Sequence, residues 1–98
     1  MYKIIILPLA RKDIRNSADW YEQQKKGLGK RFTAHVRKIV SLIQQNPASF
    51  NIKFDDVRIA VLSIFPYLIL YRIDESNQSI EIYAVYHTSQ NPNNWEGR

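Results

Sequence analysis

The sequence predicts an α+β domain in which a helical hairpin packs on one face of a small, mainly antiparallel sheet. Three observations predict this class: an apolar, β-rich stretch comes first, two segments with helical periodicity follow, and three stretches with strand periodicity come last. The expected order is therefore β-α-α-β-β-β. We expect a single domain over 1–98, because this length suits one core and no linker, repeat or low-complexity stretch interrupts the pattern.

The first predicted strand is the β-rich stretch "YKIIIL" at 2–7, which ends at Pro8. Proline is well tolerated in the first turn of a helix, so a helix is expected to begin there. Small and apolar residues then recur at helical spacing, at Ala10, Ile14, Ser17, Ala18 and Tyr21. The stretch "KKGLGK" at 25–30 ends this pattern with two of the three glycines.

A second helix is expected from about Leu28 to the stretch "QQNP", because Pro47 disfavours helical backbone at Asn46. Its apolar residues form one stripe, at Leu28, Phe32, Val36, Ile39, Val40 and Ile43. Because only a short glycine loop joins the two helices, we expect them to form an antiparallel hairpin.

Strand periodicity marks the rest of the chain. Strands are expected at "VRIAVL" (57–62), "YLILYRI" (67–73) and "SIEIYAVYH" (79–87). The dipeptide "FP" separates the first two, and "DESNQ" supplies a turn before the third. Such short links imply an antiparallel meander, and the N-terminal strand is expected at a sheet edge or beside a strand of the meander.

Composition excludes several classes of protein. No cysteine is present, so disulfides and cysteine-based zinc sites are excluded, which fits a reducing cytosol. The apolar run near the N-terminus is too short for a membrane span or a secretory signal, so we expect a cytoplasmic protein with no membrane partner. We also expect no cofactor and no metal, because His35 and His87 fall on different elements and no metal-ligand spacing or phosphate-binding glycine loop occurs.

The net charge of +5 is concentrated in the first half of the chain. Residues 1–50 hold ten Lys/Arg and three Asp/Glu, whereas residues 51–98 hold four and six. Four of the cations lie opposite the apolar stripe of the second helix, at Lys30, Arg31, Arg37 and Lys38. This face is a solvated helix surface, a docking surface for an acidic protein, or a contact with nucleic acid or the ribosome, and charge alone does not separate these possibilities.

Two ordered motifs carry a family resemblance that covers essentially the whole chain. They are "VRIAVLSIFPYLILYRI" at 57–73 and "IEIYAVYHTSQNPNNW" at 80–95. Together with the hairpin before them, they resemble the RelE/ParE superfamily of toxins from type II toxin–antitoxin modules, which includes ParE-like plasmid stabilisation proteins. The resemblance implies a growth-inhibiting toxin that a cognate antitoxin neutralises in a hetero-oligomer. It also implies one of two targets. ParE-like toxins inhibit DNA gyrase, whereas RelE-like toxins are mRNA interferases that cut mRNA on the ribosome.

Two positions depart from the RelE-like pattern. RelE-like nucleases usually carry arginines where this chain has Leu68, early in "YLILY", and Thr88, just after the last strand. These departures favour a ParE-like inhibitor of DNA gyrase. A RelE-like endonuclease and a degenerate family member that has lost its toxicity remain as alternatives.

A metal-independent nuclease needs a group to take a proton, a group to return one and a cation for the charge that builds on phosphorus. In this chain His87 suits the acid–base role, Arg58 is the best cation and Tyr83 can donate a proton. The structural alternatives are a strand-end hydrogen bond for His87 and a salt bridge for Arg58. The acidic residues that could pair with Arg58 are Asp55, Asp56 and Glu81.

Alternation of side chains predicts which sheet face these residues occupy. Glu81, Tyr83 and His87 are expected on the open face, and Arg58 is expected there too. The residues expected under the helices are Ile80, Ile82 and Ala84.

Further candidates for binding a target or nucleic acid are Tyr67, Arg72, Tyr86 and Trp95, together with the four cations of the second helix. The structural alternative for Arg72 is a paired or snorkelling arginine, and for the aromatic residues it is the edge of the core. We expect the antitoxin to be acidic or amphipathic and to lay an extended or helical segment across exposed apolar surface.

Overall fold

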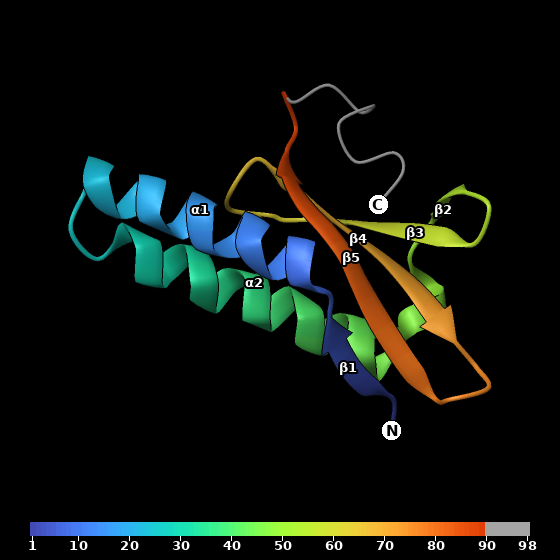
Figure 1. The fold of residues 1–98 in the computed structure, drawn as a ribbon. Coiled ribbons are helices and arrows are strands. Elements are labelled where there is room, and N and C mark those ends of the chain that lie inside the picture. The colour runs from blue at the N-terminus through green and yellow to red at the C-terminus, as the bar shows by residue number, and fades with distance from the viewer. Residues whose placement is uncertain (90–98) are drawn as a thin grey trace.

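The computed structural model describes residues 1–89, in which two helices lie side by side on one face of a five-stranded sheet (Figure 1). In chain order the elements are β1 (Lys3–Ile6), α1 (Pro8–Gln24), α2 (Leu28–Gln45), the 3-10 helix η1 (Pro47–Ser49), β2 (Ile52–Phe54), β3 (Val57–Val61), β4 (Tyr67–Asp74) and β5 (Ser79–His87). The predicted α+β class and the order of the helices and longer strands are confirmed. The short elements η1 and β2 were not predicted.

The sheet has the strand order β1-β5-β4-β3-β2, so the N-terminal strand lies at an edge beside the last strand. β1 runs parallel to β5, with Ile4 opposite Ile80, and the other pairs are antiparallel. A parallel pair needs a long crossover connection, which the hairpin and the meander provide here. α1 begins at Pro8 directly after β1, as predicted, and this places the hairpin across the sheet.

The loop between the helices is held by one carboxylate. Gly27 has a positive φ of 89°, a conformation that glycine adopts without steric cost. The side chain of Glu22 accepts hydrogen bonds from the backbone N–H of Gly27 at 2.9 Å and of Gly29 at 3.0 Å. These two hydrogen bonds lower the pKa of Glu22, because they favour the ionised carboxylate. The carboxylate therefore fixes the start of α2 against the end of α1.

Gly29 allows the two helices to approach closely. A Cβ atom at this position would lie 2.5 Å from the backbone carbonyl oxygen of Ala18. A backbone atom cannot move aside as a flexible side chain can, so any larger residue forces the helices apart. Gly29 is thus required because the two helices pack closely there, whereas Gly27 is required because its backbone has a positive φ.

We expect Gly29→Ala to lower the free energy of unfolding by about 1–2 kcal/mol, because the clash outweighs the better helix propensity of alanine. Gly29→Leu should lower it further, since leucine and alanine have similar helix propensities and differ mainly in size. Gly27 provides the matched control, because nothing lies within 4 Å of a Cβ placed there. Urea unfolding curves should give equal losses for Gly27→Ala and Gly27→Leu, and equal losses at position 29 would contradict the close approach.

The core lies between the helices and the sheet. The predicted stripe of α2 is buried from Phe32 to Ile43, and Leu28 at its start is partly buried. The ring of Phe32 stacks or packs edge-on against three other aromatic rings, those of Tyr21, Phe65 and Tyr67. Neither helix in residues 1–89 is long and apolar enough to cross a membrane.

A bulge in β5 changes which side chains face the helices. Leu70 pairs with Ala84 but the next residue of β4, Tyr71, pairs with Ile82, so Tyr83 is an extra residue in β5. Beyond this bulge the alternation is inverted, and Val85 joins the core under the helices while Ala84 belongs to a cluster on the opposite face. The expectation that Ala84 lies under the helices is therefore wrong, whereas Ile80 and Ile82 lie there as predicted.

The opposite face of the sheet carries its own apolar cluster. Its buried members are Val57, Leu70, Ala84 and Tyr86, and Phe54, Ile59, Leu68 and Tyr83 pack around them. Because both sheet faces bury apolar side chains, β3 and β4 alternate between two apolar sets rather than between apolar and polar residues.

Candidate functional site

His87 lies at the end of β5 on the helix side of the sheet. It pairs with Tyr67 at the start of β4, and the two ring centroids are 5.2 Å apart in an edge-to-face arrangement. The expectation that His87 lies on the open face is wrong, because the bulge at Tyr83 inverts the alternation before the strand ends.

A pocket of about 470 Å³ surrounds this strand end. Its lining residues come from α1 and from the ends of the two central strands: Ser17, Trp20, Tyr21, Tyr67, His87 and Ser89. Trp20 is 55% exposed, which is unusual for so large an apolar side chain. Burial is the main cause that raises the pKa of Tyr21, and neighbouring Tyr67 adds to it. The pocket thus combines aromatic rings with hydroxyl groups and one imidazole.

Ser89 fixes the orientation of the His87 ring through its Nδ1 atom. Its Nδ1 accepts a hydrogen bond from the backbone N–H of Ser89 at 3.0 Å and lies 2.7 Å from the Ser89 hydroxyl. An Nδ1 that accepts from a backbone N–H carries no proton, so the neutral ring carries its proton on Nε2. This is the strand-end hydrogen bond that we gave as the structural alternative for His87.

Arg58 is also on the helix side of the sheet. It pairs across the ladder with Tyr71, a member of the core under the helices, so the expected open-face position is wrong. Its Nη1 donates to the backbone carbonyls of Phe50 at 2.6 Å and Ala48 at 3.3 Å. The guanidinium therefore holds η1 and the residue after it against β3.

Arg72 and Tyr83 lie on the opposite face. Arg72 forms a salt bridge with Asp56, with 3.0 Å between Nε and Oδ1, and its Cζ lies 5.8 Å from the centre of the Tyr83 ring. Arg72 is therefore the paired arginine that we gave as its structural alternative. Asp56, one of the expected partners of Arg58, therefore pairs with Arg72 instead.

The three candidate catalytic residues do not meet at one point. Arg58 and His87 pair with residues of β4 that are four positions apart, which corresponds to roughly 13 Å along the strand. Tyr83 lies with the cluster on the other face of the sheet. No position is within hydrogen-bonding reach of all three side chains.

Tyr67 and Tyr86 are mostly covered, at 7% and 8% exposure, so little of either ring is available to stack on a base. Tyr67 packs in the aromatic cluster under the helices and Tyr86 in the opposite cluster. Trp95 lies outside the described residues.

Tyr71 is fully buried, and its hydroxyl donates to the backbone carbonyl of Pro47 at 2.6 Å. Burial raises the pKa of Tyr71 to about 12, although the nearby Arg58 guanidinium opposes the rise. The folded state therefore disfavours ionised Tyr71. This contribution to stability is fully present below pH 10, where tyrosine in the unfolded chain is also neutral, and it is lost as the pH rises toward 12.

We expect the free energy of unfolding to fall by roughly 2 kcal/mol between pH 9 and 12 through Tyr71 alone. Tyr71→Phe should be less stable than the wild type at neutral pH, because the Pro47 carbonyl loses its donor, but its stability should fall less steeply with alkaline pH. Urea unfolding over this range measures both. Parallel pH profiles of the two proteins would contradict this account.

His35 has a structural role that the sequence did not predict. It is buried on α2, and its Nε2 accepts hydrogen bonds from the backbone N–H of Ser63 at 3.2 Å and of Ile64 at 3.4 Å. It thus holds the loop between β3 and β4. Within the described residues, no group of three or more His, Asp or Glu side chains is placed to hold a metal ion.

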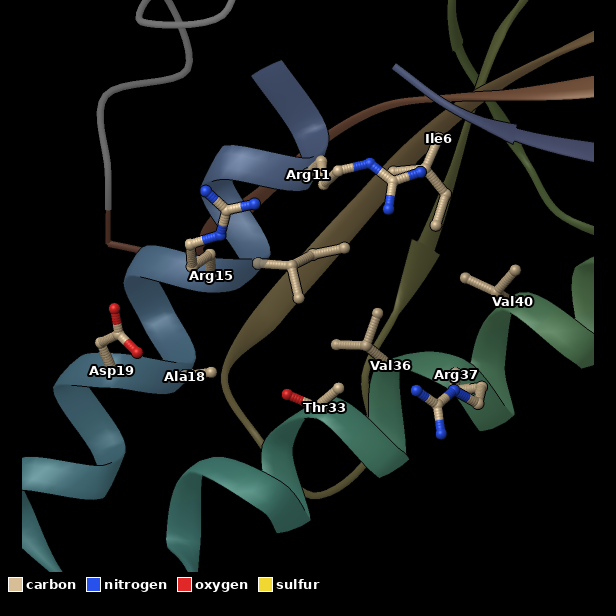
Figure 2. Close-up of a pocket in the computed structure, with 10 residues that line it drawn as sticks. Ile6, Arg11, Arg15, Ala18, Asp19, Thr33, Val36, Arg37 and Val40 are labelled. Carbon is tan, nitrogen blue, oxygen red and sulfur yellow. The ribbon is translucent and has the colours of Figure 1, made fainter. Parts of the chain in front are cut away.

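The cations predicted on α2 are all exposed: Lys30, Arg31, Arg37 and Lys38. Arg37 differs from the others, because it lines a groove of about 360 Å³ between α1 and α2 together with Arg11 and Arg15 (Figure 2). Arg11 and Arg15 were not among the predicted site residues. Their four-residue spacing in "RKDIR", which puts both on one helix face, was the available signal.

Comparison with known proteins gives one family and several similar folds. A family model described as the ParE toxin of the type II toxin–antitoxin system parDE matches residues 4–92. No curated protein matches the sequence. The E. coli RelBE toxin–antitoxin complex contains a chain with a TM-score of 0.70 and 14% identity, covering 92% of this chain and 100% of that one.

Two further solved structures have the same fold. A chain of the chromosomal ParDE system from P. aeruginosa has a TM-score of 0.68 and 18% identity, covering 91% of this chain and 98% of that one. The isolated E. coli RelE toxin has a TM-score of 0.68 and 15% identity, covering 94% of this chain and 89% of that one. At these identities the likeness establishes the fold, and the family model adds the relationship in sequence.

Proposed function

Since this chain belongs to the ParE toxin family of type II toxin–antitoxin systems, we propose that it arrests growth by binding and inhibiting DNA gyrase, without breaking or forming bonds itself. The toxin class follows from the family, whereas the choice of gyrase is the proposal.

One observation carries the choice of gyrase over mRNA: the residues suited to RNA cleavage are apart and already engaged. Arg58 donates to two backbone carbonyls, and Arg72 pairs with Asp56. His87 lies roughly 13 Å along the sheet from Arg58. A cation within reach of the proton-transfer group is what cleavage requires. The positions of Leu68 and Thr88 add no such cation.

The second candidate is a RelE-like endoribonuclease, and one observation favours it. The strand-end pocket gathers His87, Tyr67 and Trp20 around a cavity of about 470 Å³, where a base could stack near the imidazole. In that case His87 would be the acid–base group of the cleavage reaction. The cation that stabilises the charge on phosphorus would come from outside the residues that line this pocket.

The partner that we propose is a cognate antitoxin, which forms a hetero-oligomer with the chain. One of the structures with this fold, from E. coli, is a complex of a toxin with its antitoxin. An antitoxin that orders a segment on binding must recover the ordering cost through a large contact area.

The test is a short induction of this chain alone in bacterial cells, with RNA 5′ ends and plasmid supercoiling measured on the same samples. Gyrase inhibition predicts arrested growth, intact mRNA and relaxed plasmid, and the purified chain should then inhibit supercoiling by purified gyrase. Abundant new cuts within translated messages would overturn the proposal in favour of the endonuclease. Normal growth with folded protein present would identify a degenerate toxin, and a version with an early stop codon controls for the induction.

A further inference from the structure

Asp13 of α1 binds the backbone of β5 just beyond the bulge. β1 pairs with β5 only as far as Ile82, and Pro8 then begins α1 without a backbone N–H that could extend the ladder. The second half of β5 therefore lies beside α1 instead of a strand (Figure 1). There Oδ2 of Asp13 accepts a hydrogen bond from the backbone N–H of Val85 at 3.0 Å. The helix thus supplies an acceptor that a neighbouring strand would otherwise provide.

The bulge makes this acceptor necessary. In the bulged register Ile69 of β4 pairs with Val85, whose N–H points to Asp13 and away from β4. Val85 is 2% exposed, so little water can reach it, and a buried N–H without an acceptor destabilises the fold. A carboxylate also forms a stronger hydrogen bond with an N–H than a neutral acceptor does. The contact therefore offsets part of what the bulge costs the ladder.

A regular register without the bulge is also compatible with the apolar pattern. It would place Ile69 opposite Ala84 instead of Val85. Both faces of the sheet bury apolar side chains, so burial alone does not choose between the two registers. In the regular register the N–H of Val85 would turn toward β4, because successive residues of a strand direct their backbone groups to opposite sides. The hydrogen bond from Val85 to Asp13 therefore belongs to the bulged register alone.

The register decides which side chain enters the strand-end pocket. In the bulged register His87 pairs with Tyr67, and both line this pocket together with Trp20 of α1. In the regular register Tyr86 would pair with Tyr67 and His87 would turn to the opposite face, since a slip of one residue inverts every side chain. Asp13 and Trp20 lie about two helical turns apart on α1. One helix thus carries both the carboxylate that binds β5 and a wall of the pocket.

We propose that Asp13 is a positioning residue that selects the bulged register of β5 and so places the imidazole of His87 in the strand-end pocket. Its carboxylate stabilises one register and loses Val85 as its donor in the other. The inference does not depend on whether the target is DNA gyrase or mRNA. It adds a condition to the second candidate function, because the imidazole reaches the pocket only while Asp13 holds β5.

NMR spectroscopy of the full chain can read the register directly. Ile69 and Val85 form a non-hydrogen-bonded pair, because the N–H of Val85 points to α1, and in such pairs the Cα atoms are only about 4.5 Å apart. The wild type should therefore give a strong nuclear Overhauser cross-peak between the Hα atoms of Ile69 and Val85. In Asp13→Leu we expect this cross-peak to be replaced by one between Ile69 and Ala84.

Two variants separate the choice of register from the general loss of a carboxylate. Asp13→Asn keeps a side-chain oxygen that can accept the hydrogen bond from Val85, so it should restore the register of the wild type. Asp19→Leu removes an exposed carboxylate from the same helix and should also keep that register. If Asp13→Leu does not fold, Asp13→Ala removes the acceptor without adding bulk and gives the same readout.

The side chains give a second readout of the same slip. The ring centroids of His87 and Tyr67 are 5.2 Å apart in the bulged register, and cross-peaks between these rings should be lost in Asp13→Leu. A folded Asp13→Leu or Asp13→Ala variant that keeps both wild-type contacts would overturn the inference. A change of register in Asp19→Leu would overturn it as well, because the effect would then not be specific to the carboxylate that binds β5.

Discussion

Phe32→Ala is expected to lower the free energy of unfolding by about 3–5 kcal/mol, the range for removal of a fully buried phenylalanine. Phe32 is 0% exposed, and its ring centroid lies 4.8–5.3 Å from those of Tyr21, Phe65 and Tyr67. These partners come from α1, from the loop before β4 and from β4 itself. The ring therefore joins both helices to the sheet, and nearby atoms cannot fill the space without moving a whole element.

A loss of this size is comparable with the whole stability of many small domains. Urea unfolding followed by tryptophan fluorescence measures it, and Leu42→Ala is the control on the same helix, because Leu42 is 44% exposed. The control should change stability by less than about 1 kcal/mol. Similar losses for the two variants would show that the aromatic cluster does not connect the helices to the sheet.

The helices and longer strands could be predicted because each has enough apolar residues for a helical or strand pattern to show. The buried stripe of α2 follows from the spacing between Leu28 and Ile43, and the ends of the helices follow from Pro8, Gly27 and Pro47. The 3-10 helix and β2 have too few residues for a period to show. Their position depends instead on tertiary contacts such as the hydrogen bond from Arg58 to Phe50.

The sheet faces were mispredicted for two different physical reasons. In β5 the apolar residues alternate from Ile80 to Ala84, but Val85 follows Ala84 directly. This pair of adjacent apolar residues was the available signal for the bulge at Tyr83, and a shift of one position moves His87 to the other face. In β3 both faces are apolar, so alternation separates Arg58 from Val57 but does not say which of the two faces the helices cover.

The basic groove could be predicted only in part. The spacing of Arg11 and Arg15 puts them on one face of α1, and the spacing within α2 leaves Arg37 exposed. The fact that these side chains line the same groove depends on how the hairpin packs, for example on the close approach of Gly29 to the backbone of Ala18. A similar limit applies to the salt bridge between Arg72 and Asp56, which forms across neighbouring parts of the sheet.

Arg58→Met is expected to lower the free energy of unfolding by about 2–3 kcal/mol, because the carbonyl of Phe50 loses a charged hydrogen-bond donor while the aliphatic part of the side chain is kept. It should also raise the pKa of Tyr71 further, since the guanidinium opposes the effect of burial there. Both changes follow from a role in holding η1 and Phe50, the residue after it, against β3.

The same substitution separates this structural role from catalysis. If Arg58 only supports the fold, growth arrest by Arg58→Met should be weakened no more than by a variant of similar stability that is changed elsewhere, such as Gly29→Leu at matched expression. If Arg58 instead neutralises a phosphate, toxicity should disappear while urea unfolding stays unchanged, and Arg58→Lys should restore part of it. We expect the first outcome, because an arginine that donates to two backbone carbonyls must give up those hydrogen bonds before it can bind a phosphate.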